Sequence, residues 1–580
     1  MIFASRILLI SLVVFFGFTS NSQVMRSLTV RDTLRIASRS GGEIDSLDLY
    51  LFPNLTNLPG GYSGYQLSLP STLFFDLHNG RFDGQKKYSS PLKFSALPHV
   101  GFAYSFGSKG TQTVKVRYEQ VFGKRTFLNL DFNQLRSNSF LRNGVYALNE
   151  FEAKLNHTRK KFIFHLNADY QKAIKSQNGG LVSDSLLDQF ALEFLNTSKS
   201  AESQSKKLKI NTISLISFVN DSLQPIGLFV ENGLSIKNWK YKEGGNLSDI
   251  YQVIYFDSTE TSDHFQQSTL SNGAGFFLFK KNSQLKAGVH ADYWKVFNLS
   301  RLFDTTEVRF TGEWNARLKN LETHLYYENR FIGADFGQTA EASLSRQFNR
   351  LKFNISTHFS DQLPDPFLRY NLSNTYSPIA SWEKEKRLKI LAGFQFNIKR
   401  SSNLSLRYIH QQLKDNYFYV NGNWSNASNY NSIIHQVNVS GDISLGNFKI
   451  LPSYQFTYTS WEFSPFPMHR FDTRIVVKGF IFKAKKLKAY SGVDIQLQSS
   501  FDAATYVPML DAFSLNNQNI QNPGLANIHA FGGFQIEQFR FFLRLENIGY
   551  FWNDRKNQLA IGYPLVPFQF RVGITWDFFN

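Results

Sequence analysis

The sequence predicts an all-β protein: a transmembrane antiparallel up-and-down β-barrel of about 22 strands (roughly 18–24), preceded by a short N-terminal periplasmic arm. Two observations carry this prediction. From residue 98 onward, large apolar side chains alternate with polar ones in segments of about ten residues, which is typical of strands with lipid on one face and water on the other. The linkers between these segments also alternate between long and short, as the loops and turns at the two ends of a barrel do.

The first residues have the layout of a secretory signal peptide. The basic residue Arg6 precedes an apolar core at 7–18, and small residues follow. This core is shorter than the about 20 residues that a spanning helix needs. We therefore expect residues 1–22 to be removed before Gln23 and the mature chain to cross the periplasm to the outer membrane.

Residues 23–97 differ from the rest of the chain because they are rich in Gly, Ser and Asp and contain only short strand-like pieces. We expect them to form a periplasmic arm that leads into the barrel or lines part of it. At about 70 residues the arm looks too small for the folded plug of a large transporter. The predicted organisation is thus a signal peptide (1–22), an arm (23–97) and a barrel (98–580).

Alternation justifies each strand of the barrel in turn. In an early strand Val114 and Val116 alternate with Lys115 and Arg117, and the last strand places large apolar residues at every second position of 568–578. The predicted strands lie near 98–106, 111–121, 124–136, 147–157, 161–172, 206–219, 226–238, 265–280, 284–296, 305–317, 320–331, 338–347, 350–360, 386–398, 403–413, 432–444, 448–460, 468–482, 487–499, 525–535, 538–548 and 566–579.

The linkers predict how the barrel is oriented. Short linkers at 122–124, 157–161, 281–283, 319–320, 349–350, 399–403 and 537–538 all fall on one side of the up-and-down order. Long linkers fall on the other side, at 173–205, 239–264, 361–385, 414–431, 500–524 and 549–565. Outer-membrane barrels have short periplasmic turns and longer extracellular loops, so the last strand should run toward the periplasm.

Composition excludes several kinds of protein. The chain has no cysteine, so it contains no disulfide, zinc–thiolate site or lipid-modified Cys. Its 58 Phe and 26 Tyr suit strands and membrane interfaces. The formal charge of +18 raises nucleic acid, anionic lipid or anionic solute as partners. Because the basic residues are not gathered on one helix or stripe, we do not expect nucleic acid to bind.

One stretch carries a family resemblance. Residues 91–151 read PLKFSALPHVGFAYSFGSKGTQTVKVRYEQVFGKRTFLNLDFNQLRSNSFLRNGVYALNEF, with HNGRFDG at 78–84 before them and GGLVSDSLLDQF at 179–190 after them. This order of motifs resembles the opening of the putative-porin family of Bacteroidetes outer-membrane proteins. The specific match covers about a fifth of the chain. The resemblance implies an outer-membrane β-barrel of the porin type, with structural motifs and no catalytic residues, and it supplies no substrate.

Charged residues at alternating positions are the candidate lumen-facing residues. A charge on the lipid face would cost about 2–4 kcal/mol at the midplane, so these side chains should face water. They form either a hydrated wall of partly paired charges or a field that selects solutes, and the basic excess favours a weak anion preference. The candidates are Lys115, Arg117, Glu119, Asp131, Asp169, Arg309, Glu313, Arg317, Arg407, Arg544, Glu546 and Arg571.

A candidate constriction loop lies within the long linker 173–205. Leu186, Leu187, Phe190 and Phe194 have roughly helical spacing, and Ser183 or Asp184 is placed to cap the helix. Such a helix either packs as a lid on neighbouring loops or folds into the lumen and narrows it.

The final strand carries a candidate C-terminal assembly signal, by which the barrel-assembly machinery would recognise the chain. Its apolar positions are Phe570, Val572, Ile574, Trp576 and Phe578, although Asn580 follows the last of them. This face should contact outer-membrane lipid, with the last two aromatics at the periplasmic interface.

No motif points to catalysis, a cofactor or a metal. The twelve histidines are scattered without metal-ligand spacing, and no nucleophile elbow, phosphate-binding loop or EF-hand loop occurs. The basic linkers HTRKK (157–161) and KAKKLK (483–488) are either solvated turns or contacts for anionic head groups of the inner leaflet. We expect a non-enzymatic protein.

The expected function is passive diffusion of small hydrophilic solutes through a porin-like channel. A bore of about 22 strands would leak if it were empty, so loops or the arm should fill part of it. The alternatives are a specific transporter of lipids, glycans or chelates, and a non-conducting scaffold barrel in an envelope or export machine. The oligomeric state stays open, an oligomer included.

Overall fold

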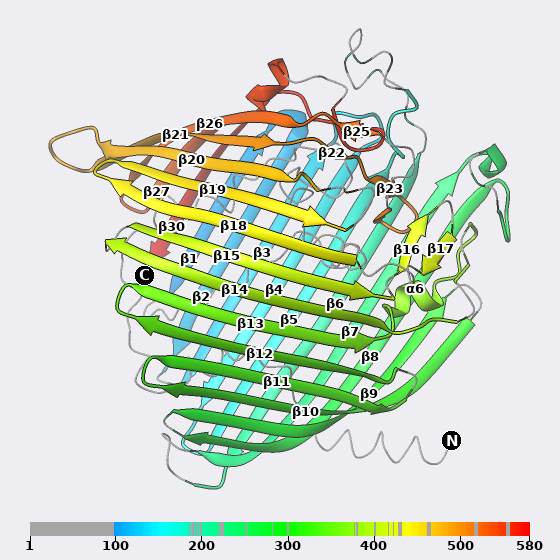
Figure 1. Cartoon of the computed structure of the whole chain (residues 1–580), viewed down its shortest axis with the longest axis vertical. Helices are drawn as coiled ribbons and strands as arrows, with labels where there is room; N and C mark the ends of the chain where they lie inside the picture. The colour runs from blue at the N-terminus through cyan, green and yellow to red at the C-terminus, as the bar shows by residue number, and fades with distance from the viewer. Residues whose placement is uncertain are drawn as a thin grey trace.

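The computed structural model describes residues 98–579, apart from parts of the connections between strands, chiefly within 184–199, 220–224, 427–431, 515–519 and 553–556, and some single positions. The predicted signal peptide (1–22) and arm (23–97) lie outside the described residues. The described chain forms one sheet of 22 strands (Figure 1). Each of the 22 predicted strands corresponds to one strand of this sheet, so the predicted fold class is confirmed.

The strands pair antiparallel in chain order, and β1 pairs with both β2 and β30, which closes the barrel and leaves no sheet edge. Closure pairs the backbone amides and carbonyls of neighbouring strands, as a sheet in lipid requires. The strands are β1 (His99–Gly107), β2 (Thr111–Phe122), β3 (Thr126–Asn138), β4 (Val145–Thr158), β5 (Phe162–Gln177), β6 (Ala201–Ser217), β7 (Ile226–Gly244), β8 (Glu260–Lys280), β9 (Ser283–Asn298), β10 (Arg301–Leu318), β11 (Leu321–Ile332), β12 (Gly337–Phe348), β13 (Leu351–Gln362), β14 (Glu385–Lys399), β15 (Ser402–Lys414), β18 (Ser432–Leu445), β19 (Phe448–Thr459), β20 (His469–Phe480), β21 (Leu487–Gln498), β26 (Leu525–Ile536), β27 (Phe539–Glu546) and β30 (Gln569–Phe579).

The connections contain short elements of their own. Two-stranded sheets form from β16 (Tyr417–Val420) with β17 (Asn423–Asn426), β22 (Phe501–Asp502) with β25 (Gln521–Asn522), β23 (Thr505–Val507) with β24 (Ala512–Ser514), and β28 (Gln558–Ala560) with β29 (Tyr563–Pro564). The short helices are η2 (Ser108–Gly110), η4 (Leu247–Asp249), α6 (Pro366–Tyr370) and η5 (Ile548–Phe551). Within the described part of the chain, no helix is long and apolar enough to cross a membrane.

The two faces of the sheet differ as the alternation predicts. On β3, β4 and β5 the large apolar side chains of Phe132, Phe151 and Tyr170 are exposed and form register partners on one face. The intervening positions, such as Asn129 and Glu152, are buried on the opposite face. An exposed apolar face suits lipid, and in a closed sheet the opposite face is the inner one.

All the long linkers lie at one end of the barrel, here called the loop end; the other is the turn end. The predicted alternation of long and short linkers is not exact, because some connections at the loop end are also short. The β1–β2 connection has three residues and the β9–β10 connection two, and both lie at the loop end. The β9–β10 connection is short because both strands are longer than predicted: β9 ends at Asn298 and β10 begins at Arg301.

Strands β6 to β10 are longer than predicted and form a raised wall at the loop end. They have 17, 19, 21, 16 and 18 residues, whereas β11, β12 and β13 have 12 each. The two ends of the predicted linker 239–264, residues 239–244 and 260–264, are therefore strand. Their outward positions carry Lys240, Lys242 and His264. Where strands extend above the lipid, both of their faces contact water, although the backbone pairing continues.

Candidate functional site

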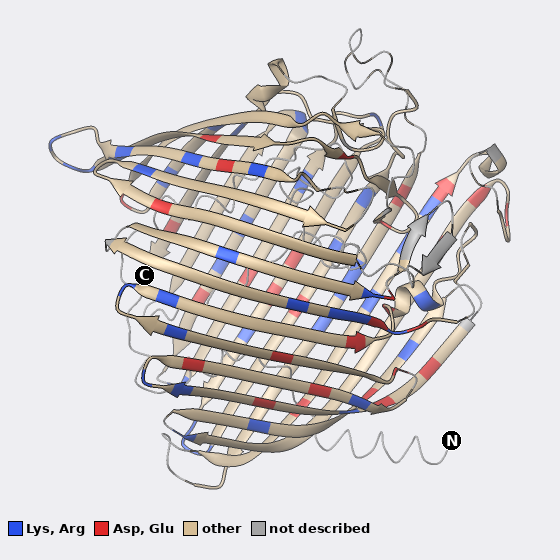
Figure 2. Ribbon diagram, in the orientation of Figure 1, with Lys and Arg blue, Asp and Glu red and all other residues tan. Residues whose placement is uncertain are grey.

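All twelve candidate lumen-facing residues lie on the inner face of the sheet. The register aligns Arg117 with Asp131, Asp131 with Glu152, and Glu152 with Asp169, all on one face. It likewise aligns Arg544 with Arg571, and Arg309 with the inner positions of β9 and β11. Figure 2 shows basic and acidic positions spread along the strands rather than gathered in one patch.

Most of these charges are paired across neighbouring strands. Arg117 Nε lies 2.7 Å from Asp131 Oδ1, and its second partner is Glu119, at 3.8 Å. Arg309 bridges two strands, with Nε 2.6 Å from Asp292 Oδ2 and Nη1 3.2 Å from Glu328 Oε2. Such pairs hold the inner wall rigid and neutralise part of its charge.

Two acidic candidates accept hydrogen bonds from neighbouring amide side chains, and one basic candidate has a longer ion pair. Glu313 accepts a hydrogen bond from Asn315 at 2.8 Å, and Asp169 accepts one from Asn167 at 2.6 Å. Arg317, near the turn end, is 71% exposed and lies 3.6 Å from Glu322. Lys115 occupies an inner position of β2 in register with Ala103 and Asn133.

Arg407 is the candidate most available to a solute. It lies midway along β15 on the inner face, in register with Gly393 and Asn438. Its side chain is exposed, and among the described residues no carboxylate forms an ion pair with it. A hydrated, uncompensated guanidinium at this height can contact an anion that passes along the wall.

The basic excess of the inner face is concentrated between β20 and β30. Arg544 contacts both Asp494 (2.8 Å) and Glu546 (3.5 Å), and Arg571 lies 3.3 Å from Glu546. On these strands seven inner basic side chains face four acidic ones. The basic residues are Arg470, Arg474, Lys478, Lys488, Arg540, Arg544 and Arg571, and the acidic ones are Asp472, Asp494, Glu546 and Asp577.

The inner face is not polar throughout. Two buried apolar clusters lie on it: Ile213, Leu215, Phe229 and Phe277 on β6–β8, and Val476, Tyr490, Phe531 and Phe542 on β20–β27. Glycines on neighbouring strands make room for these rings. A Cβ at Gly573 would lie only 2.5 Å from the Phe542 ring, so a flat aromatic covers the glycine backbone instead of projecting into the bore.

At the loop end, three connections pack against the inner face of the raised wall. They run within 363–384 with α6, 415–431 with β16 and β17, and 499–524 with β22 to β25, and their described residues together are called the lid (Figure 1). Phe367, Leu368, Met509 and Leu510 of the lid share one buried apolar cluster with inner side chains of β7, β8 and β9, among them Trp239, Phe265 and Trp294. β21, where the connection 499–524 begins, lies eleven positions from β8 in the ring of 22, so this part of the lid crosses the mouth.

Local sequence explains α6. Asp365 caps it by accepting a hydrogen bond from the Phe367 amide at 2.8 Å, and Pro366 occupies the first helical position. Phe367 then meets Phe265 edge to face, with ring centroids 5.0 Å apart. Burial raises the pKa of Tyr370, which keeps its phenol neutral beside Phe303.

Polar anchors fix the lid at its rim. Arg369 pairs with Asp335, between β11 and β12, at 2.5 Å. The side-chain oxygen of Asn374 accepts hydrogen bonds from the backbone amides of Phe256 and Asp257 at 2.9 and 3.0 Å, and its backbone amide donates to Asp263 at 2.8 Å. These contacts join the lid to both the loop 245–259 and the raised wall.

A buried ion pair holds the lid from the other side. Lys175, at the end of β5, lies 2.5 Å from Asp511, and their side chains are 3% and 0% exposed. Asp511 also accepts a hydrogen bond from Tyr506 and has a positive φ of 47°. β5 is eight strands from β21 in the ring, so this pair spans the mouth.

The candidate constriction loop is only partly described. Leu187 is buried at 3%, whereas Phe194 is 71% exposed, so these two do not share one buried face; Leu186 and Phe190 lie outside the described residues. The hydroxyl of Ser183 accepts from the Ser185 amide at 3.2 Å. The lid residues that the sequence interpretation missed had a signal: PDPFLRY (364–370) and YVPMLDAF (506–513) are apolar runs inside linkers.

The candidate assembly signal lies on β30. Phe570, Trp576 and Phe578 are exposed on the outer face, and the rings of Trp576 and Phe578 stack at 4.5 Å. Val572 and Ile574 lie on the same face by register, opposite Phe106 and Tyr104 of β1. Within the described residues, no group of three or more His, Asp or Glu side chains could hold a metal ion.

A closed barrel of this size, apolar outside and charged inside, defines an integral protein of the outer membrane. The comparison with family models agrees. Residues 95–580 match the model described as "Putative porin", and the chain belongs to that family. No curated protein matches the chain.

Several solved structures share the fold. The copper transporter OprC is 10% identical, with a TM-score of 0.60 over 84% of this chain and 82% of that one. The FrpB iron transporter from Neisseria meningitidis is 10% identical, with a TM-score of 0.57 over 83% of each chain. BauA, the ferric preacinetobactin receptor from Acinetobacter baumannii, is 11% identical, with a TM-score of 0.54 over 83% and 80%. These identities establish likeness of fold alone.

Proposed function

We propose that this protein is an outer-membrane channel for small hydrophilic solutes, with a lid that controls its external mouth. The observation that carries the proposal is the charged inner wall of the closed barrel, where many charges are ion-paired across strands but Arg407 is exposed. Such a wall supplies a water path through lipid, and the mechanism needs no catalytic residue or cofactor.

The channel should prefer anions weakly. Ion-paired side chains contribute little net electrostatic potential. Selectivity therefore depends on Arg407 and on the wall from β20 to β30, where basic side chains outnumber acidic ones. A cation near the path lowers the energy of a passing anion and raises that of a cation.

The lid accounts for how so wide a barrel avoids leakage. Barrel diameter grows with strand number, and 22 strands would leave a bore wider than that of a 16- to 18-stranded porin. An apolar cluster across the mouth, anchored by Lys175–Asp511 and Arg369–Asp335, obstructs that bore at the loop end. Passage therefore requires the lid to move.

Export follows the usual route for such barrels. We propose that residues 1–22 are a signal peptide removed before Gln23 and that the outer face of β30 is presented to the barrel-assembly machinery.

A specific transporter is the second candidate. The observation that favours it is the aromatic content of the lid and raised wall, where Trp239, Trp294, Phe303 and Tyr370 gather at the mouth. OprC, FrpB and BauA, whose fold this barrel shares, are transporters or receptors by name. Under this reading the lid would recognise one bound solute before releasing it inward.

Conductance of the purified full chain in planar bilayers, with liposome swelling in graded sugars, separates these candidates. The channel proposal expects rare openings in the intact protein and a stable, size-limited conductance when the lid anchors are weakened. Swelling by one class of solute only, or saturating uptake, would favour the specific transporter. A barrel that stays closed to ions with weakened anchors would favour the scaffold role and contradict the channel.

A further inference from the structure

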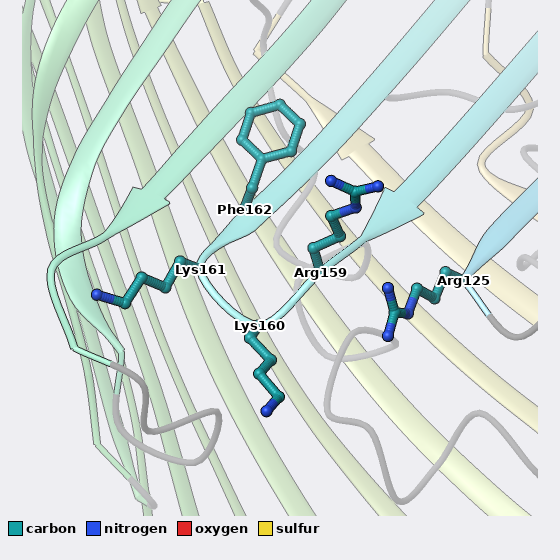
Figure 3. Close-up of a pocket in the computed structure, with 5 residues that line it drawn as sticks. All are labelled: Arg125, Arg159, Lys160, Lys161 and Phe162. Atoms are coloured by element: carbon teal, nitrogen blue, oxygen red, sulfur yellow. The ribbon is translucent and has the colours of Figure 1, made fainter.

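Two neighbouring connections at the turn end carry exposed basic side chains around a pocket. Arg125 follows β2, and Arg159, Lys160 and Lys161 connect β4 to β5; with Phe162 they line a pocket of about 340 Å³ (Figure 3). The Thr158 amide donates to the Arg125 carbonyl at 2.9 Å, which fixes the two connections side by side. The volume lies at the lower end of the range for small-ligand sites.

The cations of this pocket are uncompensated. All four side chains are exposed, and none pairs with a carboxylate in the part of the chain that the structure describes. Figure 3 shows Arg125 and Arg159 reaching into the same region from the two connections, with Lys160 below and Lys161 directed away. Like charges that line one pocket repel one another, so an anion that lies between them stabilises the arrangement. Planar guanidinium groups suit phosphate oxygens in particular.

The pocket lies at the level where lipid head groups begin. Phe162 belongs to the outer face of β5 and stacks on Phe164, with centroids 6.3 Å apart, and Phe122 is 47% exposed on the outer face of β2. Outer-face aromatics at a strand end mark the membrane interface. The cations just beyond them therefore stand beside the phosphates of the periplasmic leaflet.

We propose that this pocket binds the phosphodiester head group of an anionic phospholipid in the inner leaflet of the outer membrane. Arg125 and Arg159 contact the phosphate, Lys160 adds charge at the rim, and the acyl chains continue along the aromatic edge at Phe122 and Phe162. The site anchors the turn end of β2–β5 in the membrane. It does not depend on whether the barrel conducts.

A second basic connection provides a matched control. The β20–β21 connection carries Lys483, Lys485 and Lys486 and also has exposed apolar side chains, Ile481 and Phe482. If the cations were attracted only to the negative membrane surface in general, each cation of either connection would contribute a similar binding free energy. A built site requires the paired guanidinium groups and their neighbouring aromatic ring.

The test measures lipid affinity by native mass spectrometry of the detergent-purified full chain. Dioleoylphosphatidylglycerol is titrated against wild type, the double variant Arg125→Gln/Arg159→Gln and the control Lys483→Gln/Lys485→Gln, which removes the same charge. Dioleoylphosphatidylethanolamine and inorganic phosphate serve as separate probes. Heat-modifiable migration in gels verifies that each variant forms a barrel.

We expect the pocket variant to bind phosphatidylglycerol about tenfold more weakly than wild type, and the control to stay within about twofold. Equal losses in both variants would show diffuse attraction and overturn the site. Equal affinity of wild type for phosphatidylethanolamine would also overturn it. Inorganic phosphate binding as tightly as the lipid would show a free-anion site and reject the lipid assignment.

Discussion

Neutralising Asp511 should open the lid. Asp511→Asn preserves the shape of the side chain and tolerates the positive φ of 47° at this position, but it leaves the Lys175 ammonium without the charge that it meets at 2.5 Å. Both side chains are almost fully buried while the lid is closed, so loss of this ion pair destabilises the closed state in particular.

The size of the effect follows from the burial of the pair. Removing one partner of a buried ion pair costs about 3–5 kcal/mol. The lower end applies here because the asparagine oxygen can still accept a hydrogen bond. At 1.36 kcal/mol per factor of ten, about 3 kcal/mol raises the ratio of open to closed lid on the order of a hundredfold.

Open probability in planar bilayers measures that ratio directly. A channel that opens rarely as wild type should be open for much of the record as Asp511→Asn. The double variant Lys175→Met/Asp511→Asn removes the buried charge as well and should return most of the closed time. Equal open probabilities for wild type and Asp511→Asn, or a double variant as open as the single one, would refute the idea that this pair holds the lid.

Three further outcomes are expected. Arg407→Gln should lower the anion-to-cation permeability ratio measured from reversal potentials, whereas Arg317→Gln at the turn end should change it little; the opposite order would contradict the proposed selectivity wall. Gly573→Ala should destabilise the barrel by about 1–3 kcal/mol in urea unfolding, because the new Cβ meets an aromatic ring at 2.5 Å, while Gly312→Ala, whose Cβ meets nothing closer than 3.7 Å, should be nearly neutral. Phe578→Lys places a charge on the outer face of the last strand and should reduce the heat-modifiable, assembled fraction in outer-membrane preparations; normal assembly would argue against a role in recognition.

The barrel could be predicted from the sequence because lipid enforces a period of two on each strand that it covers. Where that pressure ends, prediction fails. Lys240 and Lys242 lie on the outer face of β7, although the sequence predicts a linker at 239–264. A strand with water on both faces has no alternation of apolar and polar residues by which it could be predicted.

Other features depend on contacts that no local pattern encodes. Phe229 and Phe542 occupy inner positions that alternation assigns to polar residues, and they fit there only because glycines on adjacent strands leave room for flat rings. The lid was expected in the linker 173–205, but its described core comes from 363–384 and 499–524. The apolar residues of those linkers can be identified in the sequence, but the inner face of β7–β9 against which they pack cannot.

The Lys175–Asp511 pair joins residues 336 positions apart in the chain, one in the first strands to be synthesised and one in the last quarter. Contacts of such separation form only after the intervening chain has been ordered, because the entropy of closing so long a loop must first be overcome. The buried cluster around Trp294 has the same dependence, since it combines side chains from β7–β9 with Met509 and Leu510. We therefore expect the lid contacts to form late in folding, after the strands between β5 and β21 have been ordered.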